Sequence, residues 1–419
     1  MILTGLLLLA LALLGAPLFA VILASALIGF GRTGVDGMVV AMEVYRIAET
    51  PVLIAIPLFT FAGYLLGESQ APQRLVRVSN ALFGWLPGGL AIVALVTCAL
   101  FTAFTGASGV TIVALGALLY PALRDAGYHE RFSLGLVTTS GSLGLLFAPS
   151  LPLILYGIVA EQSVDTLFIA GILPGSLMLL LLALWSMRAG GRLGRSAPER
   201  VSFREAVTAV RQAIWEIPLP VVVLGGVYSG LLAVSEAAVV TVVYVFVVEV
   251  LVYREISWPR LPGVVRESMV MVGGILVILG ASLASTNYLI DAQVPMQLFD
   301  LVTTHISSKL TFLILLNVFL LVLGTMLDVF SALVIVVPLI LPIAAGYDVD
   351  PIHLGIIFLA NMQIGYCTPP VGINLFIASY RFDKPVVTLY RATLPFLVLL
   401  FATVLVITYW PWLSLALVR

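Results

Sequence analysis

Residues that can bind an ion or an anion interrupt several apolar segments of this chain. The longest interruption is Gly365–Asn374, which lies between the apolar segments Ile352–Ala360 and Leu375–Ala378. It contains Pro369 and Pro370, which remove two backbone donors and prevent a helix from continuing. Lipid cannot satisfy the freed backbone groups, so they must face protein, water, an ion or a substrate. The stretch is therefore a candidate binding site.

Shorter interruptions occur at Thr105–Gly109, at Ser140–Gly144, at Pro149–Pro152 and at Gly324–Asp328. Unwound carbonyls and the hydroxyls of serine and threonine are ligands that the hard cation Na+ prefers. We expect two sodium sites, predicted from Gly106, Ser108, Ser140 and Gly144, and from Gly324, Thr325, Asp328, Gly365 and Thr368. In the second site, residues 365 and 368 would face the Gly324–Asp328 tip across one ion. The alternative is that these small residues only allow helices to pack closely.

Four side chains are candidates for binding an anionic substrate: Thr111, Asp328, Asn374 and Arg32. A carboxylate at membrane depth is costly, so Asp328 either serves the site or caps the following helix, whose N-terminus favours negative charge. Asn374 would bind substrate near a helix N-terminus or make an interhelical hydrogen bond. Arg32 would pair with the anion or extend to the lipid headgroups.

The composition assigns the chain to the multi-pass helical membrane proteins. Of its 419 residues, 61% are hydrophobic and 10% charged, and the mean hydropathy is +1.17. Apolar runs of ~20 residues recur along the chain, each long enough to cross a bilayer core of ~30 Å. The first run, Ile2–Phe30, lacks a basic start and a cleavage site, so we interpret it as a retained span. The net charge of −1 gives no reason to expect a nucleic-acid partner.

The chain divides into two similar halves. Residues 1–187 contain a predicted hairpin at about 87–123 and a broken helix at about 132–160, and residues 217–419 contain a hairpin at about 310–342 and a broken helix at about 352–380. An amphipathic cytoplasmic linker at 188–216 joins them. The halves correspond at an offset of roughly 220 residues, which places Pro149 beside Pro369 and the breaks at Pro152 and Pro370 in equivalent segments.

The positions of the arginines predict which loops of the chain face the cytoplasm. If the linker is cytoplasmic, the other arginine-rich loops are cytoplasmic too, as the positive-inside rule requires, provided that both hairpins are re-entrant. The first hairpin then opens to the cytoplasm and the second to the periplasm, so the two halves are inverted repeats. Inverted repeats with paired broken helices are typical of secondary transporters, whose sites lie near the bilayer midplane.

Four segments resemble the large membrane subunit of tripartite ATP-independent periplasmic (TRAP) transporters: Thr105–Gly116, Ser140–Tyr156, Gly324–Pro338 and Asn361–Phe376. The resemblance implies sodium-driven uptake of an organic acid anion by an elevator movement in the bacterial inner membrane. It also implies two partners, a small four-helix membrane subunit and a periplasmic substrate-binding protein. No four-helix block precedes Met1, so we expect a separate small subunit. Ala107 stands where the family often has serine.

Two other functions are alternatives to such a TRAP subunit. A stand-alone ion-coupled dicarboxylate or anion carrier of the same fold would need no binding protein. An intramembrane enzyme is disfavoured because no nucleophile–base pair and no metal-ligand spacing occurs at membrane depth. We therefore expect a transporter with Na+ as its coupling ion, no organic cofactor and no enzymatic activity.

Overall fold

The computed structural model describes residues 6–418 except 9, 12–13, 47–48, 87 and 194–202. All regular elements in this part of the chain are helical. Seven helices are long and apolar enough to span a bilayer, and a bent pair, Glu130–Leu146 with Leu151–Val159, would make an eighth. The chain is thus a multi-pass helical membrane protein, as its composition predicts.

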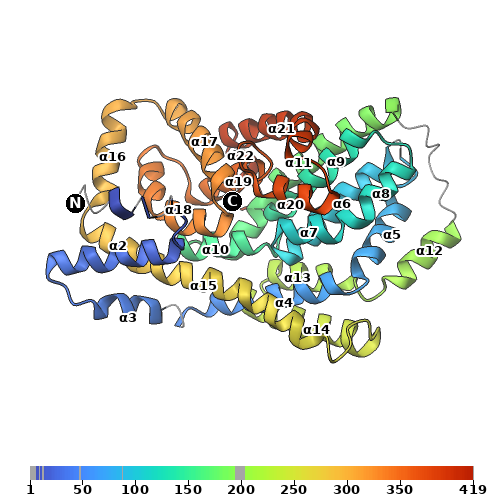
Figure 1. The fold of residues 1–419 in the computed structure, drawn as a ribbon, viewed down its shortest axis with the longest axis horizontal. Helices are drawn as coiled ribbons and strands as arrows, with labels where there is room; N and C mark the ends of the chain where they lie inside the picture. Colours follow the sequence, from blue (N-terminus) through green and yellow to red (C-terminus); the bar gives the residue numbers. More distant parts are fainter. Residues whose placement is uncertain are drawn as a thin grey trace.

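The helices form two groups joined by connecting helices. The first group, here called the scaffold side, runs along the lower edge of Figure 1 and comprises α2 (Leu18–Thr33), α3 (Met38–Arg46), α4 (Ala55–Glu68), α13 (Pro218–Tyr228), α14 (Val234–Phe246) and α15 (Leu261–Asp291). A short helix at Pro51–Ile54 leads into α4, and a π-helical segment, Val247–Val252, extends α14.

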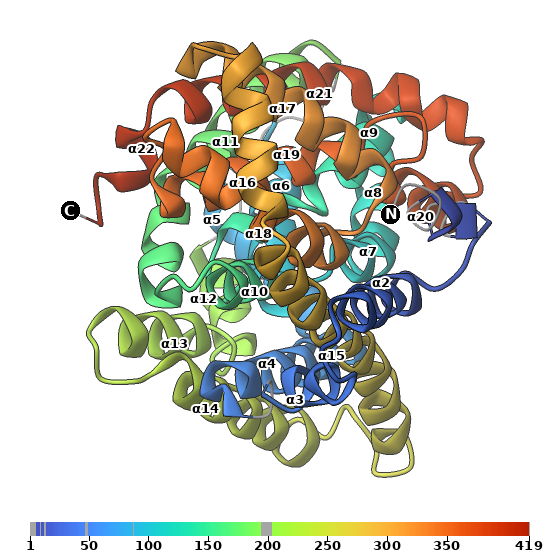
Figure 2. The same cartoon turned by 90° about the vertical axis from the view of Figure 1, so that its left-hand side faces the viewer.

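The second group, the hairpin side, contains the segments singled out by the sequence. It comprises α6 (Gly89–Thr105), α7 (Ser108–Ala114), α8 (Gly116–Asp125), α9 (Glu130–Ser140), η3 (Leu143–Leu146), α10 (Leu151–Val159), α11 (Val164–Leu193), α17 (Lys309–Met326), α18 (Val329–Gly346), α19 (Pro351–Gly365), α20 (Ile373–Phe382), α21 (Val386–Tyr409) and α22 (Trp412–Leu415). Figure 2 shows α17, α19 and α21 stacked above α15 and α4.

Three further helices connect the groups. Helix α5 (Ala71–Phe83) follows α4 and leads to α6, and α16 (Val294–His305) follows α15 and leads to α17. The two lie at opposite ends of the molecule in Figure 1, and α12 (Phe203–Gln212) lies next to α5. Each hairpin is therefore attached to the scaffold side through one connecting helix.

Equivalent boundaries in the two halves keep a constant separation. The residue pairs Thr105 and Met326, and Glu130 and Pro351, are each 221 residues apart, and they mark the end of the first hairpin arm and the start of the broken helix. The second hairpin closes on itself at its base, where Phe312 stacks on Tyr347 with ring centroids 4.5 Å apart. The chain thus enters and leaves that hairpin at one end.

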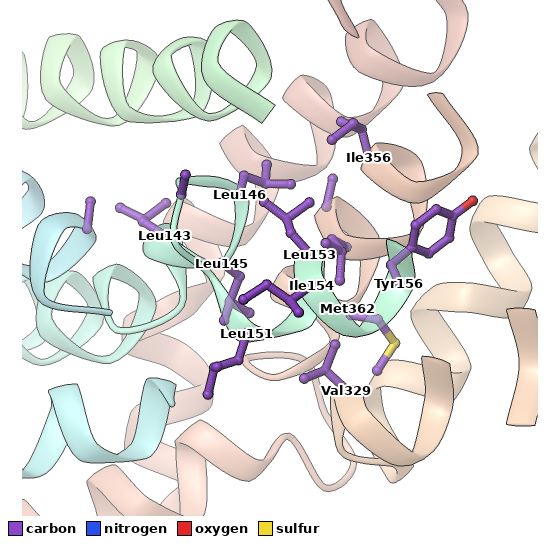
Figure 3. Close-up of a cluster of buried hydrophobic side chains, with 14 of the residues drawn as sticks. Leu143, Leu145, Leu146, Leu151, Leu153, Ile154, Tyr156, Val329, Ile356 and Met362 are labelled. Carbon is purple, nitrogen blue, oxygen red and sulfur yellow. The ribbon is translucent and has the colours of Figure 1, made fainter. Parts of the chain in front are cut away.

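The apolar core lies where the two broken helices meet. Figure 3 shows side chains from η3 and α10 packed against α18 and α19: Leu143, Leu145, Leu146, Leu151, Leu153, Ile154 and Tyr156 on one side, and Val329, Ile356 and Met362 on the other. Between membrane helices the gain comes from close van der Waals contact rather than from removal of water. This core holds the breaks of both halves at fixed positions.

Several predicted boundaries are wrong. The span Ile2–Phe30 is not one helix, because the chain turns at Leu14–Pro17, where Gly15 has a φ of +91°; its first residues lie outside the described part. The second hairpin turns only at Leu327 and Asp328, because α17 continues through Gly324 and Thr325 against α19.

The predicted linker and the start of the second half also differ. Helix α11 continues to Leu193, α12 covers Phe203–Gln212, and residues 194–202 of the predicted linker lie outside the described residues, as does Pro87 at the start of the first hairpin. Helix α13 has 11 residues, too few to cross a bilayer alone. The first regular span of the second half is therefore α14.

Candidate functional site

The first hairpin turns at Gly106, between α6 and α7. Gly106 has a φ of +66°, and a Cβ placed there would lie 2.5 Å from the Leu151 side chain at the start of α10. Only glycine fits this left-handed and crowded position. The turn therefore brings the first tip directly against the first broken helix.

Buried oxygens gather where this tip meets the break. The Thr102 hydroxyl donates to the Gly141 carbonyl at 2.8 Å and lies 2.7 Å from the Thr111 hydroxyl. The Thr111 hydroxyl lies 3.5 Å from the Ala107 carbonyl. Both threonines are fully buried. Thr111 was predicted to bind substrate, whereas Thr102 was missed because it lies inside the apolar run that precedes the tip.

The first tip also reaches the other half of the chain. The Ser108 hydroxyl donates to the Asn374 side-chain oxygen at 2.7 Å, and both residues are buried. Asn374 thus makes the interhelical hydrogen bond that was one of the two roles expected for it.

Ser140 and Gly144 lie against α6, and Gly141 beside them reaches the first tip, since a Cβ there would lie 3.2 Å from the Ser108 carbonyl oxygen. The Ser140 hydroxyl donates to the Val137 carbonyl at 3.3 Å, and a Cβ on Gly144 would lie 2.4 Å from the Ala99 carbonyl oxygen. Gly144 therefore has the close-packing role that was the alternative to ion binding.

The second tip presents Asp328 as the N-cap of α18. Its carboxylate accepts from the Ser331 amide and from the Ser331 hydroxyl, each at 2.8 Å. The Tyr366 hydroxyl, from the break of the other helix, accepts from the Val329 amide. Asp328 therefore satisfies orphan donors at a helix start, as expected of a cap. Tyr366 was missed because a tyrosine beside Gly365 reads as an apolar residue.

Tip and break of the second half meet through their backbones. A Cβ on Gly365 would lie 2.6 Å from the Gly324 backbone, and the Gly372 amide donates to the Thr325 carbonyl at 3.1 Å. The hydroxyls of Thr325 and Thr368 donate to carbonyls of their own helices, each at 2.8 Å. The two glycines permit contact between main chains, and the threonine side chains do not face each other.

The two breaks touch each other at the centre of the molecule. The Ser142 hydroxyl donates to the Gln363 carbonyl at 3.2 Å, and the Cys367 thiol lies 3.7 Å from the Thr138 carbonyl. The Gln363 side chain is fully buried, and neither its oxygen nor its nitrogen has a hydrogen-bond partner. Such a group ordinarily pairs with water, an ion or a ligand. Gln363 is a further residue that sequence reasoning missed.

The remaining predicted residues are placed as follows. Arg32 is exposed on α2, which packs against α15 and α3, and in Figure 1 α2 lies far from α7 and α20. Pro149, Pro369 and Pro370 lie in the breaks, whereas Pro152 occupies the first turn of α10. Proline favours that position because it needs no amide donor there. Pro152 therefore starts a helix and does not break one.

Two clefts lie between the scaffold side and the hairpin side. The larger, about 820 Å³, is bordered by α10 and α18 on the hairpin side and by α15 on the scaffold side. The smaller, about 380 Å³, reaches Gly109 and Val110 directly after the first tip and has Glu68 and Glu267 on its scaffold wall. Between the clefts the two groups touch: a Cβ on Gly63 of α4 would lie 2.6 Å from the Thr105 backbone at the end of α6, and only the smaller cleft reaches a tip.

Comparisons with known proteins agree with this architecture. Residues 5–413 match the family model described as "Tripartite ATP-independent periplasmic transporter, DctM component". The C4-dicarboxylate TRAP transporter large permease protein of Pseudomonas aeruginosa is 36% identical over 90% of this chain and 88% of its own length. The isethionate TRAP transporter permease protein DctMQ of Oleidesulfovibrio alaskensis is 33% identical over 94% of this chain and 64% of its own length.

A solved structure shares the fold. The crystal structure of the YdaH transporter of Alcanivorax borkumensis superposes with a TM-score of 0.65 at 15% identity, covering 90% of this chain and 89% of the other. The similarity extends over both halves of the chain. The relatives are named as transporter permeases and not as enzymes.

Proposed function

Because the chain belongs to the DctM family of tripartite ATP-independent periplasmic transporters, we propose that it couples sodium entry to the uptake of a small organic acid anion. It would act in the bacterial inner membrane with a separate small membrane subunit and a periplasmic substrate-binding protein. The observation that carries the proposal is the pairing of a hairpin tip with a broken helix in each half. Each pairing gathers oxygens that are not committed to a regular helix.

The ligands near the tips suit Na+. At the first tip the candidates are the hydroxyls of Thr102 and Thr111 and the carbonyls of Gly141 and Ala107, which lie within hydrogen-bond distance of one another. At the second tip they are backbone carbonyls around Gly324 and Gly365. Neutral oxygens of this kind hold a hard monovalent cation without a permanent charge partner. Bound sodium would then supply positive charge for a carboxylate at the α20 N-terminus, beside Asn374.

An elevator movement would join binding to transport. Clefts of about 820 and 380 Å³ occupy part of the boundary between the hairpin side and the scaffold side, and elsewhere α6 lies on α4 and α18 lies on α15. The hairpin side would therefore slide as one body along α4 and α15. The core shared by the two breaks favours joint movement of both hairpins. Alternating access by movement of one bundle against another around a fixed site is the usual mechanism of transporters with discontinuous helices.

The partners are supported by the relatives. This chain covers 64% of the isethionate permease named DctMQ, which extends well beyond the matched segment. A second membrane component fused to that permease would account for the extra length, and here it would be a separate chain. The second candidate, a stand-alone anion carrier, keeps the site and dispenses with the binding protein.

The test is uptake of a labelled C4-dicarboxylate into proteoliposomes that contain the chain with its small subunit. We expect uptake only with an imposed inward sodium gradient and with the liganded binding protein added outside. Replacing external sodium with potassium should abolish uptake. Uptake that persists without sodium would overturn the coupling, and sodium-driven uptake without the binding protein would favour the stand-alone carrier.

A further inference from the structure

The largest concentration of buried charge among the described residues surrounds Arg74 on α5, away from both tips. Its guanidinium contacts three carboxylates: Glu216, Glu255 at 2.5 Å and Glu249 at 3.1 Å. The Tyr253 ring lies beneath it, with the guanidinium carbon 4.1 Å from the ring centroid. Arg74 is 7% exposed and Glu249 is fully buried. We call these five side chains the Arg74 cluster.

The charges of this cluster do not cancel. One guanidinium faces three carboxylates, and in a low-dielectric interior the excess negative charge repels itself. Burial raises the pKa of the Glu216 carboxyl above its usual value. Removing Arg74 would leave three carboxylates without a counter-ion, which is the costly way to break a buried ion pair. The arginine is therefore essential to the cluster, whereas one of the three acids is dispensable.

The cluster ties three separate segments together. Arg74 comes from the helix that connects α4 to the first hairpin, Glu216 from the segment between α12 and α13, and Glu249 from the π-helical end of α14. Neighbouring bonds reinforce the junction: Arg77 donates to the Gln212 side chain at 2.9 Å, and the Tyr253 hydroxyl donates to the Gln212 carbonyl at 2.8 Å. Helix α5 is thereby fixed to α12 and to the scaffold side.

The equivalent helix of the second half is held differently. Helix α16 has no buried residue and takes part in no ion pair among the described residues. It packs against α18 of the hairpin that it precedes, where a Cβ on Gly346 would lie 2.1 Å from the Phe299 ring. Helix α5 also packs along α6 of its own hairpin, where the Thr97 hydroxyl donates to the Ser79 hydroxyl at 2.9 Å. In the described part of the chain the two connecting helices therefore differ in one respect: only α5 is also bound to the scaffold side by buried charges.

We propose that Arg74 is a positioning residue for transport, which holds α5 stationary while the first hairpin moves. The inference rests on the proposed movement of the hairpin side. The chain between α5 and α6 supplies the bend, since Gly84, Gly88 and Gly89 lie there and Gly88 has a φ of +73°. If α5 is held in place and the chain bends only at the glycines that follow it, the first hairpin can move in only one direction about this hinge.

The test uses the full chain reconstituted with its partners and two pairs of engineered cysteines, each joined by a bifunctional thiol cross-linker that reduction cleaves. In the variant R77C/Q212C the cross-linker joins α5 to α12; it takes the place of a direct disulfide because Arg77 and Gln212 meet only at the ends of long side chains. We expect uptake after cross-linking to stay within about twofold of the reduced protein, because neither helix moves relative to the other. Loss of uptake on cross-linking, restored by reduction, would overturn the proposal.

A second cross-link separates this inference from the proposed function. Ser282 on α15 donates to the Val334 carbonyl on α18 at 2.6 Å, so the same reagent applied to S282C/V334C would join the scaffold side to the second hairpin. Cross-linking of this pair should stop uptake. If uptake continues with that cross-link closed, the movement of the hairpin side is refuted, whatever the result for R77C/Q212C.

Substitution of the cluster completes the test. R74M should lower the maximal uptake rate at least about tenfold while the KM values for substrate and sodium stay unchanged, because the site itself is intact. R74K should restore part of the maximal uptake rate that R74M loses. E249Q, which removes one excess carboxylate, should keep the maximal uptake rate of the parent protein. If R74M does not insert, R74K is compared with E249Q in its place. If R74M and the parent protein have equal maximal uptake rates, Arg74 does not have this role.

Discussion

The two hairpin tips occupy equivalent places in their halves but make contacts of different kinds. The first tip uses side chains and reaches across the molecule, since Ser108 donates to Asn374 of the second half. The second tip uses its backbone and stays with its own break, where Gly324 meets Gly365 and Asp328 caps α18. The first tip is thus a polar joint between the halves, and the second is a close main-chain contact within one half.

This difference suggests how each tip responds to a bound ion. The oxygens at the first tip are hydroxyls and carbonyls that already bond one another, so an ion would replace existing hydrogen bonds. At the second tip, the hydroxyls of Thr325 and Thr368 are engaged within their own helices. An ion there would depend on carbonyls whose positions the two glycines fix. Four experiments test the contrast, from the largest expected loss of stability to the smallest.

The largest loss of stability should come from G365A. The added methyl group would lie 2.6 Å from the Gly324 backbone, which cannot move aside as a flexible side chain could. Overpacking of this kind costs about 1–3 kcal/mol, and we expect a lower melting temperature with at least about tenfold slower uptake. The matched control is G273A on α15, where nothing lies within 4 Å of the new methyl group. Unchanged uptake by G365A would show that the second tip does not need this contact.

Substitutions at Asp328 distinguish its role as a helix cap from the role of its negative charge. Asparagine caps a helix about as well as aspartate, whereas alanine loses about 0.5–2 kcal/mol of helix stability. D328N should therefore keep the melting temperature of the parent protein, and D328A should lower it; we expect D328A to abolish uptake without preventing membrane insertion. If the charge serves the site, D328N will also raise the sodium concentration for half-maximal uptake. Full activity of D328A would remove Asp328 from the site.

The joint between the halves is tested by S108A, N374A and the double variant. A buried hydrogen bond between neutral groups contributes about 0.5–1.5 kcal/mol, so each single change should lower stability by that amount. In the double variant the loss should be smaller than the sum of the two single losses, which measures the coupling between the halves. Additive losses would mean that the bond between Ser108 and Asn374 contributes nothing of its own.

The smallest effect is expected at the surface. Glu130 of the first half and Lys384 of the second form an ion pair at 2.6 Å, but both side chains are more than a third exposed. Water and salt screen such a pair, so E130Q should leave uptake and the melting temperature unchanged within error. A loss comparable to that of S108A would show that contacts between the halves matter wherever they occur, and the contrast drawn between the tips would fail.

Much of the fold could be predicted from the sequence because lipid imposes strict rules. Apolar length located the spans, and the prolines at 369 and 370 located the break between α19 and α20. The first hairpin turn was found because Gly106 interrupts an apolar run. At Gly324 a glycine did not locate the hairpin turn correctly, since a helix packed along a neighbouring helix tolerates one glycine without ending.

The site was harder to predict because side-chain partners depend on packing between distant segments. Nothing near Ser108 in the sequence identifies Asn374 as its partner, 266 residues away. Thr102 looked like one more residue of a membrane span, although its hydroxyl reaches a break in another helix. Arg74 was counted only as a loop charge for orientation, and its three carboxylates come from segments more than 140 residues further along the chain.

The backbone contact at the second tip also has a consequence for divergence. A carbonyl oxygen stays in place when the side chain of its residue is replaced, so the inner face of that tip can survive many substitutions at Thr325 or Thr368. The first tip is lined by buried hydroxyls, and each replacement there alters the chemistry itself. Substitutions of side chains are therefore expected to change the chemistry of the first tip more readily than that of the second.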